Sequence, residues 1–236
     1  MTAFLAHSSV RSPLALTLDL DDTLWPIWPA IERAEQQLHG WLQQHAPATA
    51  QRFDPPALRA LRNAVEAEKA DWGHDLSAIR RESIARALAL TGHDPLLAGP
   101  AFDVFFAARQ RVEFFDDALP GLERLAARFP IYAVTNGNAN LATVGLSGFF
   151  RGCLSASELG IGKPDARIFH LACERLGVLP AQVLHVGDDL LLDVHGARDA
   201  GLQALWLKRP QHADGELPEG CVQAGSLLEL ADSLGC

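Results

Sequence analysis

A short, mostly apolar run near the start of the chain ends abruptly in a group of aspartates. The run is Leu14–Leu18, and Asp19, Asp21 and Asp22 follow it almost immediately. A run of this length bounded by polar residues is typical of a buried strand. In open α/β sheets, ligands bind beyond the C-terminal ends of the strands. The feature therefore predicts an α/β sheet with a functional site at the end of its first strand.

A long helical block separates this strand from the rest of the expected sheet. Residues 24–117 are rich in Ala, Leu, Gln, Glu and Arg, and their apolar residues recur at helical spacing. We therefore expect about four helices inserted directly after the first strand. The segments with the clearest helical spacing are Ile31–His45, Pro56–Asp71, Ser77–Leu90 and Ala101–Val112.

Strand and helix patterns alternate after Asp117, which implies a parallel sheet covered by helices on both faces. A short helix is expected soon after the second strand, and another over Asp193–Ala200. We therefore expect an α/β fold with a Rossmann-like, doubly wound parallel sheet built from residues 1–23 and 118–236. Residues 24–117 would form an all-helical cap domain. The later expected strands are Ile131–Val134, Gly152–Ser155, Val183–Val186 and Gln203–Leu207.

The charge balance narrows the classes of partner. The chain carries a formal net charge of −9, which opposes binding to the phosphate backbone of nucleic acids and to anionic membrane surfaces. No stretch approaches the ~20 apolar residues of a membrane span, and the first residues, Met1–Pro13, contain no apolar run of signal-peptide type. The four cysteines form no CxxC pair. We expect a cytoplasmic protein with reduced thiols, monomeric or homodimeric, that acts on a small molecule.

Four polar motifs lie at or just beyond the expected strand ends, and together they offer the parts that phosphate-ester hydrolysis requires. That reaction needs a nucleophile, an acid for the leaving oxygen, and positive charge around the phosphoryl group. A carboxylate nucleophile also needs a divalent cation to offset the charge of its substrate, and carboxylate oxygens suit Mg²⁺. The motifs are Asp19-Leu20-Asp21-Asp22-Thr23, Thr135-Asn136, Lys163-Pro164, and Gly187-Asp188-Asp189 with Asp193.

Each residue type suggests a role in that chemistry. Asp19 is the expected nucleophile, and Asp21 would face the same way if the strand geometry continued, so that it could protonate the leaving alkoxide. Thr135 and Asn136 would bind the phosphoryl oxygens, and Lys163 would supply a fixed positive charge. The expected Mg²⁺ ligands are Asp19, Asp21 and Asp188, with Asp189 and Asp193 as further ligands or as partners of metal-bound water.

In this order, the motifs DLDDT, VTN, GKP and VGDD…D resemble those of the haloacid dehalogenase superfamily of hydrolases. The resemblance spans Asp19–Asp193 and implies a Rossmann-like core, a C1-type helical cap and an aspartyl-phosphate intermediate on Asp19. Dehalogenases of the superfamily typically lack the second aspartate, because a halide leaves without a proton. The presence of Asp21 therefore resembles the phosphatase branch.

A narrower resemblance suggests a substrate. The stretches ALTLDLDDTLW, LRNAVEAE, VTNGNAN and LHVGDDLLLDVHGA are similar to the YigB-type bacterial phosphatases. Those enzymes act on flavin mononucleotide and on 5-amino-6-(5-phosphoribitylamino)uracil, a riboflavin precursor. On this basis Trp25, His74 and Arg80 are candidate substrate-binding residues. A sugar phosphate or a nucleotide is the alternative substrate.

Simpler interpretations stand beside these. Asp188 and Asp189 are also suited to capping a helix, Trp25 to packing, and Arg80 to a solvated helix face. A phosphorylated receiver domain uses similar residues, although its nucleophile does not precede a helical insert. A catalytically inactive binding protein of the same fold is the remaining alternative, which the intact set of acids and lysine disfavours.

Overall fold

The computed structural model describes residues 12–210 and 215–236, and it divides into two compact units. The first comprises the chain up to Pro26, Glu113–Gly137 and Leu141–Cys236. The second comprises Ile27–Val112 together with residues 138–140. Residues 1–11 of the expected core lie outside the described part of the chain. The short segment 138–140 was expected in the core, but the structure assigns it to the helical unit.

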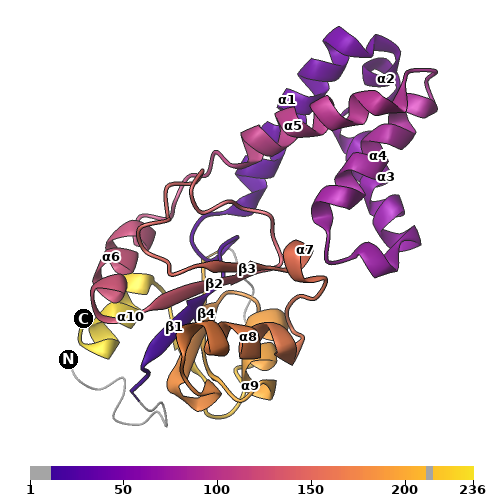
Figure 1. Cartoon of the computed structure of the whole chain (residues 1–236). Helices are drawn as coiled ribbons and strands as arrows, with labels where there is room; N and C mark the ends of the chain where they lie inside the picture. The colour runs from indigo at the N-terminus through magenta and orange to yellow at the C-terminus, as the bar shows by residue number, and fades with distance from the viewer. Residues whose placement is uncertain (1–11, 211–214) are drawn as a thin grey trace. The chain divides into compact units, whose positions relative to one another are not determined.

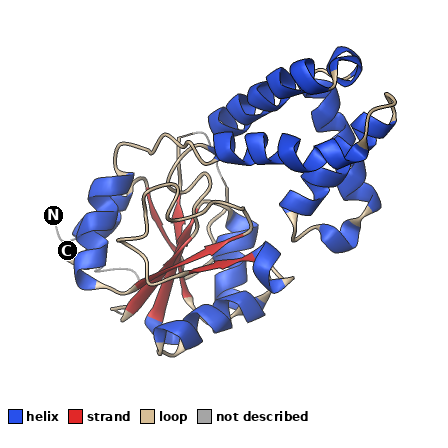
Figure 2. Ribbon diagram, turned by 45° about the horizontal axis from the view of Figure 1, so that its top comes forward, coloured by secondary structure: helices blue, strands red, loops and turns tan. Residues whose placement is uncertain are grey.

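The first unit contains a six-stranded sheet in which every neighbouring pair is parallel. The strand order is β3-β2-β1-β4-β5-β6, which confirms the expected doubly wound sheet (Figures 1 and 2). The last strand, β6, was not predicted. The strands are β1 Ala15–Leu18, β2 Ile131–Thr135, β3 Cys153–Ser155, β4 Val183–Gly187, β5 Gln203–Leu207 and β6 Val222–Ala224.

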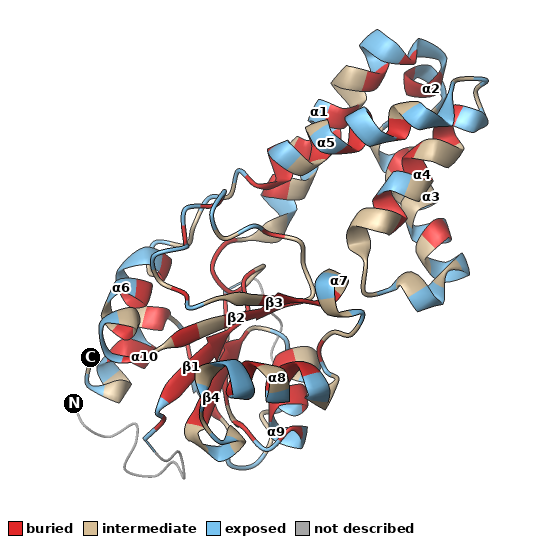
Figure 3. Cartoon of the chain, viewed as in Figure 1, coloured by how far each residue is buried: buried red, intermediate tan, exposed pale blue. Residues whose placement is uncertain are grey.

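Strand β1 lies at the centre of this sheet, and all four of its residues are buried (Figure 3). Leu16 is paired with Ile131 of β2 on one side and with Leu184 of β4 on the other. A strand covered on both faces reads as a continuous apolar run, because neither set of side chains reaches solvent. This explains why the run before Asp19 lacks alternating polar residues.

Helices cover the sheet on two sides: α6 and α10 lie on one side, and α8 and α9 on the other (Figure 1). Two local predictions were wrong. In the described chain no helix connects β2 to β3, and the segment expected as one helix over 193–200 is a π-helix, η4, followed by a short α-helix. The helical segments are α6 Ala118–Arg128, α7 Ala156–Leu159, α8 Ala166–Leu176, η3 Pro180–Gln182, η4 Leu190–His195, α9 Gly196–Asp199 and α10 Leu227–Leu234.

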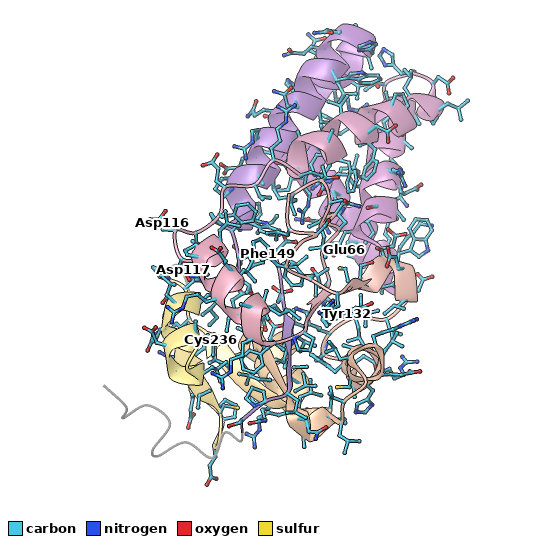
Figure 4. The ribbon with its side chains drawn as sticks, turned by 60° about the vertical axis from the view of Figure 1, so that its left-hand side comes forward. Glu66, Asp116, Asp117, Tyr132, Phe149 and Cys236 are labelled. Atoms are coloured by element: carbon cyan, nitrogen blue, oxygen red, sulfur yellow. The ribbon has the colours of Figure 1, made fainter. Side chains whose placement is uncertain are left out.

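Asp117 directly precedes α6 and is hydrogen-bonded to the start of α10 (Figure 4). Its Oδ2 accepts a hydrogen bond from the Leu227 backbone N–H at 2.6 Å, and its Oδ1 accepts one from Arg209 Nη1 at 2.7 Å. Carboxylates near helix N-termini are stabilised by the unpaired N–H groups there. One partly buried acid thus joins three segments of the first unit.

Every regular element that the structure describes in the second unit is a helix. Leu38, Ile84 and Phe102 belong to its buried apolar cluster. Asp54 and Asp75 cap two of the helices by accepting hydrogen bonds from backbone N–H groups three residues on. No helix in the described chain is long and apolar enough to span a bilayer. The helical segments are α1 Ile27–His45, α2 Pro47–Arg52, α3 Pro55–Glu68, η1 Ala70–Trp72, α4 Leu76–Ala89, η2 Pro95–Leu97 and α5 Ala98–Arg109.

Candidate active site

The predicted catalytic residues meet at the point where the strand order reverses. β1 lies between β2 and β4, so the chain leaves it in one direction through β2 and β3 and later continues on the other side through β4. Asp19 follows β1, Thr135 ends β2, and Asp188 follows β4. Such a switch point leaves a crevice beyond the carboxyl ends of the strands, where α/β proteins bind ligands.

Lys163 binds two of the carboxylates at this switch point. Its Nζ lies 2.5 Å from Asp19 Oδ1 and 2.6 Å from Asp193 Oδ1, and all three side chains are buried. Burial disfavours the ammonium charge, but the attraction of the two carboxylates outweighs it and raises the pKa of Lys163 above its usual range. The lysine is therefore a permanent positive charge beside the candidate nucleophile.

Three carboxylates crowd this site. Ligand oxygens of Asp19, Asp188 and Asp193 all lie within 4.8 Å of one another. Burial raises the pKa of Asp19 to about 7, with neighbouring carboxylates adding to the effect and Lys163 opposing it. Burial and the charges of Asp19 and Asp193 raise the pKa of Asp188 to about 9. The crowded carboxylates leave an unfavourable excess of negative charge, which a divalent cation would offset. Their oxygens also fit Mg²⁺, which prefers hard oxygen ligands.

Asp193 is held in place by the protein rather than left open for a ligand. Its Oδ1 accepts from Lys163 Nζ and lies 2.9 Å from His185 Nε2, and its Oδ2 accepts from the Asp189 backbone N–H at 3.1 Å. Burial opposes its charge, but Lys163 and His185 hold the pKa of Asp193 well below its usual range. Gly187 is required beside it, because a Cβ there would lie 2.2 Å from Asp193 Cγ.

His185 is fully buried and contacts Asp193, which binds the lysine. Its Nδ1 lies 2.9 Å from Thr17 Oγ1 in β1, so that it links two strands to Asp193. Of the roles expected for Asp189, the structure supports helix capping rather than metal binding. It is exposed, its Oδ1 accepts from the Leu191 and Leu192 backbone N–H groups at 2.8 Å, and it therefore caps η4.

Thr23 connects Asp19 to Asp188, the acid that follows β4, a role that sequence reasoning did not assign. Its Oγ1 lies 3.1 Å from Asp19 Oδ2 and 2.7 Å from Asp188 Oδ1, and the hydroxyl proton is shared between them. Arg209 fixes this turn by donating from Nε and Nη2 to the Thr23 carbonyl at 3.0 and 2.7 Å. The only sequence signal for Thr23 was its place in the DLDDT motif, and nothing local indicated Arg209.

Asp21 lies beyond the end of regular strand geometry, because β1 stops at Leu18. The alternation of strand side chains therefore does not orient it. Instead Asp21 forms an isolated bridge with Trp25, whose Nε1 donates to Asp21 Oδ1 at 2.9 Å. Its charge is close enough to contribute to the raised pKa of Asp19. Asp21 is not one of the three carboxylates that cluster around the candidate metal position.

The prediction that Trp25 contacts the substrate is wrong. Its side chain is fully buried and packs edge-to-face on Phe114, with ring centroids 5.6 Å apart. The indole therefore has no face open to a ligand and serves to hold Asp21. Asp22 has φ of 58°, a left-handed conformation that aspartate tolerates, and its backbone N–H donates to the Trp25 carbonyl.

Asn136 contacts the lysine segment rather than presenting its whole amide to a phosphoryl group. Its Nδ2 donates to the Lys163 carbonyl and its Oδ1 accepts from the Lys163 backbone N–H, both at 2.8 Å. Gly162 makes room for this pairing, since a Cβ there would lie 2.5 Å from Asn136 Oδ1. Thr135 is almost completely buried, and its Oγ1 accepts from the Gly137 backbone N–H at 2.9 Å.

Two candidate substrate residues belong to the helical unit. Arg80 was assigned by default to a solvated helix face, but the structure buries it beside Glu35. It lines a cavity whose lining residues all belong to that unit, and Trp28 also lines this cavity. His74 lies in the turn between η1 and α4 and is not among the residues that line this cavity.

Comparison with known proteins decides the family. The model of the haloacid dehalogenase-like hydrolases matches residues 14–201. The chain belongs to this family. The matched region contains all four motifs that suggested the resemblance.

Several relatives are similar over most of the chain. A 5-amino-6-(5-phospho-D-ribitylamino)uracil phosphatase, YigB of Escherichia coli, is 37% identical over 204 residues, which cover 85% of each chain. A phosphoserine phosphatase of Thermus thermophilus is 31% identical, covering 78% of this chain and 72% of the relative. Among solved structures, a 2-haloacid dehalogenase from Pseudomonas syringae is 36% identical with a TM-score of 0.86, covering 94% of this chain and 97% of that one.

Proposed function

We propose that this hydrolase is a Mg²⁺-dependent phosphatase that cleaves a small phosphate monoester through an aspartyl-phosphate on Asp19. One observation carries the proposal. The Asp19 carboxylate lies against the Lys163 ammonium, within 4.8 Å of the ligand atoms of Asp188 and Asp193, and a second acid, Asp21, follows two residues later.

In the first step, an Asp19 oxygen attacks phosphorus and the bond between phosphorus and the ester oxygen breaks. Asp21 donates a proton to the departing alkoxide, which leaves as an alcohol. In the second step, Asp21 accepts a proton from water, the water oxygen attacks phosphorus, and the bond to Asp19 breaks. Inorganic phosphate leaves and Asp19 is regenerated, so the aspartate pair returns to its starting state.

The surrounding residues set the charge and position of the nucleophile. Lys163 offsets the negative charge that accumulates between Asp19 and the phosphoryl oxygens. Thr23 holds one Asp19 oxygen, and Asp193 and Asn136 hold Lys163 in place. Asp19 and Asp188 would hold Mg²⁺, which when bound supplies the positive charge that lets a carboxylate approach a phosphate dianion.

The substrate we propose is a ribityl phosphate, either flavin mononucleotide or its pyrimidine precursor. The activity for which the E. coli relative is named supports this choice, and that relative is 37% identical across most of both chains. Because a phosphoserine phosphatase is also among the relatives, other small phosphate monoesters are alternative substrates. A cytoplasmic location is part of the proposal, supported by four cysteines that are all free thiols.

Haloacid dehalogenation is the second candidate, because the P. syringae protein of known structure, which is 36% identical, is a 2-haloacid dehalogenase. Asp21 argues against it. A halide leaves without a proton, whereas an alkoxide requires one. In this chain the indole N–H of Trp25 holds the Asp21 carboxylate in the loop that also carries the proposed nucleophile.

One experiment separates the two candidates. The purified chain is incubated with a panel of phosphorylated metabolites and with 2-chloropropionate, each with Mg²⁺ or with EDTA, and released phosphate and chloride are measured. We expect Mg²⁺-dependent phosphate release and no chloride. Chloride release without phosphate release would overturn the proposal.

A further inference from the structure

His185 is a buried polar residue that the proposed mechanism does not use. It lies on β4, and its side chain is 0% exposed. Each of its ring nitrogens has a polar partner: Nδ1 lies 2.9 Å from Thr17 Oγ1 on β1, and Nε2 lies 2.9 Å from Asp193 Oδ1. All three residues belong to the first unit, so these contacts do not involve the helical unit.

Packing fixes the orientation of the His185 ring. Phe169 of α8, which is also fully buried, contacts it edge-to-face, with ring centroids 5.0 Å apart and an interplanar angle of 83°. A ring that is packed in this way and has a polar partner at each nitrogen cannot turn without losing a buried hydrogen bond. Nε2 is therefore aimed at Asp193.

The chemistry of the two groups sets the direction of the bond between His185 and Asp193. An ionised carboxylate only accepts hydrogen bonds, so Nε2 must carry a proton and act as the donor. Both the neutral Nε2–H tautomer and the imidazolium carry a proton at this nitrogen, so the donor role does not depend on the charge of the ring. The Thr17 hydroxyl can donate or accept, and it suits Nδ1 in either form.

Asp193 is bound at both of its oxygens. Its Oδ1 accepts from Lys163 Nζ at 2.6 Å and from His185 Nε2, and its Oδ2 accepts from the Asp189 backbone N–H at 3.1 Å. The same Lys163 Nζ donates to Asp19 Oδ1 at 2.5 Å. A continuous chain of hydrogen bonds therefore runs from His185 through Asp193 and Lys163 to the proposed nucleophile.

The position of the lysine charge depends on this chain of contacts. A lysine ammonium ends a flexible four-carbon stem, so the groups that it binds decide where its charge lies. Asp19 and Asp193 both attract the Lys163 ammonium. The N–H of His185 shares the charge of Asp193 Oδ1 and keeps that carboxylate in one orientation. Lys163 is thereby held between two fixed oxygens rather than drawn away toward one of them.

We propose that His185 is a positioning residue that acts through Asp193. Its Nε2–H fixes that carboxylate, which in turn holds the Lys163 ammonium beside Asp19. His185 acts only through other side chains and is not itself a catalytic residue. The inference rests on the proposed function and extends it to a side chain that has no exposed surface. The competing role is a structural one, in which His185 only joins β4 to β1 through Thr17.

Two substitutions of His185 separate these roles, because the two amide side chains replace different ring nitrogens. His185→Gln places an N–H near the position of Nε2 and has no atom at Nδ1, so it keeps a donor to Asp193. His185→Asn places a polar atom near the position of Nδ1 and has none at Nε2, so it keeps a partner for Thr17 and loses the donor to Asp193. Gln should therefore replace a positioning residue better, whereas Asn should better replace a residue that only joins the strands.

Steady-state release of phosphate from p-nitrophenyl phosphate with saturating Mg²⁺ gives kcat and KM for each variant. In His185→Asn we expect kcat to fall by roughly 10-fold or more, the range for a hydrogen bond to a charged group. KM should change little, because the lysine charge acts on the transition state. His185→Gln should keep most of the wild-type kcat. Circular dichroism melts establish that each variant is folded.

A control variant and a second background test the route of the effect. His170→Asn removes an exposed histidine of α8 whose Nε2 lies 2.9 Å from the Ala200 carbonyl, and it should leave kcat unchanged. In an Asp193→Asn background, His185→Asn should cause no further loss of kcat, because residues that act as one unit are not additive. A full additional loss in that background would overturn action through Asp193.

The protonation of His185 can be measured in the wild-type protein, without relying on the folding of any asparagine variant. Correlation spectra of ¹⁵N-labelled histidine rings show which nitrogen carries a proton, and the signal of His185 is the one that His185→Gln removes. We expect a proton on Nε2. A proton on Nδ1 alone would overturn the proposal, because Asp193 would then receive no donor from the ring.

Failure of this inference is distinguishable from failure of the proposed function. If the wild-type chain turns over p-nitrophenyl phosphate but His185→Asn is as active as His185→Gln or more active, the positioning role alone is overturned. If the wild-type chain releases phosphate neither from p-nitrophenyl phosphate nor from the metabolite panel, the proposed function falls and this role with it.

Discussion

Lys163 Nζ lies 2.5 Å from Asp19 Oδ1, and the two side chains are 3% and 8% exposed. A buried ion pair of this kind is costly to break from one side, because the remaining charge loses its partner without regaining water. In the proposed mechanism, the same contact places a cation where negative charge accumulates during attack on phosphorus. The proposal therefore couples stability and catalysis at this pair.

Removing the lysine should damage both properties. Lys163→Met leaves Asp19 and Asp193 facing each other without compensation, and we expect unfolding free energy to fall by ~3–5 kcal/mol. Urea denaturation followed by circular dichroism measures this loss, and phosphate release should fall by at least ~10²-fold. If the variant kept the wild-type urea midpoint and the wild-type rate of phosphate release, the ion pair would contribute neither to stability nor to catalysis.

Asp19→Asn should abolish turnover and leave the fold intact. The amide cannot form the acyl-phosphate, but it has nearly the same shape and relieves the cost of burying a charge among Asp188 and Asp193. Lys163 keeps Asp193 as its charged partner, so this change does not leave a buried charge unpaired. We expect no detectable phosphate release and a thermal midpoint no lower than the wild type in metal-free buffer at neutral pH. Near-normal turnover of this variant would refute Asp19 as the nucleophile.

Asp21→Asn should slow the hydrolysis of each substrate, and the loss of rate should be larger when the leaving group is more basic. Alkyl phosphates depend on a proton from Asp21, whereas p-nitrophenolate leaves without one. The ratio of kcat for the two substrate classes is the readout, and we expect it to change by ~10²-fold or more. Trp25→Phe is the matched control: it keeps a buried aromatic ring but removes the hydrogen bond to Asp21 together with part of the indole, so its effect should be in the same direction and smaller. An identical loss on both classes in Asp21→Asn would argue against an acid role.

Mg²⁺ should stabilise the protein more at high pH than at low pH. In the metal-free protein, burial raises the pKa of Asp19 to about 7 and that of Asp188 to about 9, both above the ordinary 3.8. The folded state then holds more protons than the unfolded state, so that stability declines as pH rises between ~4 and ~9. Mg²⁺ would bind the deprotonated acids and so oppose that decline.

Thermal melts with and without saturating Mg²⁺ across this pH range measure the effect. The increase in melting temperature caused by Mg²⁺ should grow as pH rises through 7, and Ca²⁺ gives a second ion for comparison. Asp188→Asn should abolish most of the increase. An increase that is independent of pH, or absent, would contradict binding at these carboxylates.

The features that sequence determined are those that depend on neighbours in the chain. Apolar runs that end in polar motifs located β1, β2 and β4, and the helical spacing between them located the insert, because strand and helix periodicity are local properties. Parallel strands bring their carboxyl ends to one edge, so Asp19, Thr135 and Asp188 could be placed together in advance.

Tertiary structure alone decided how those residues are held and what surrounds them. The bond from Thr23 to Asp188 joins residues 165 positions apart, and Arg209 reaches Thr23 over 186 positions. Trp25 and Trp28 are near neighbours in sequence but differ in burial. Trp25 is fully buried and packs in the core, whereas Trp28 is exposed and lines a cavity. Such partners depend on the packing of distant segments, and that packing leaves no periodic signal in the chain.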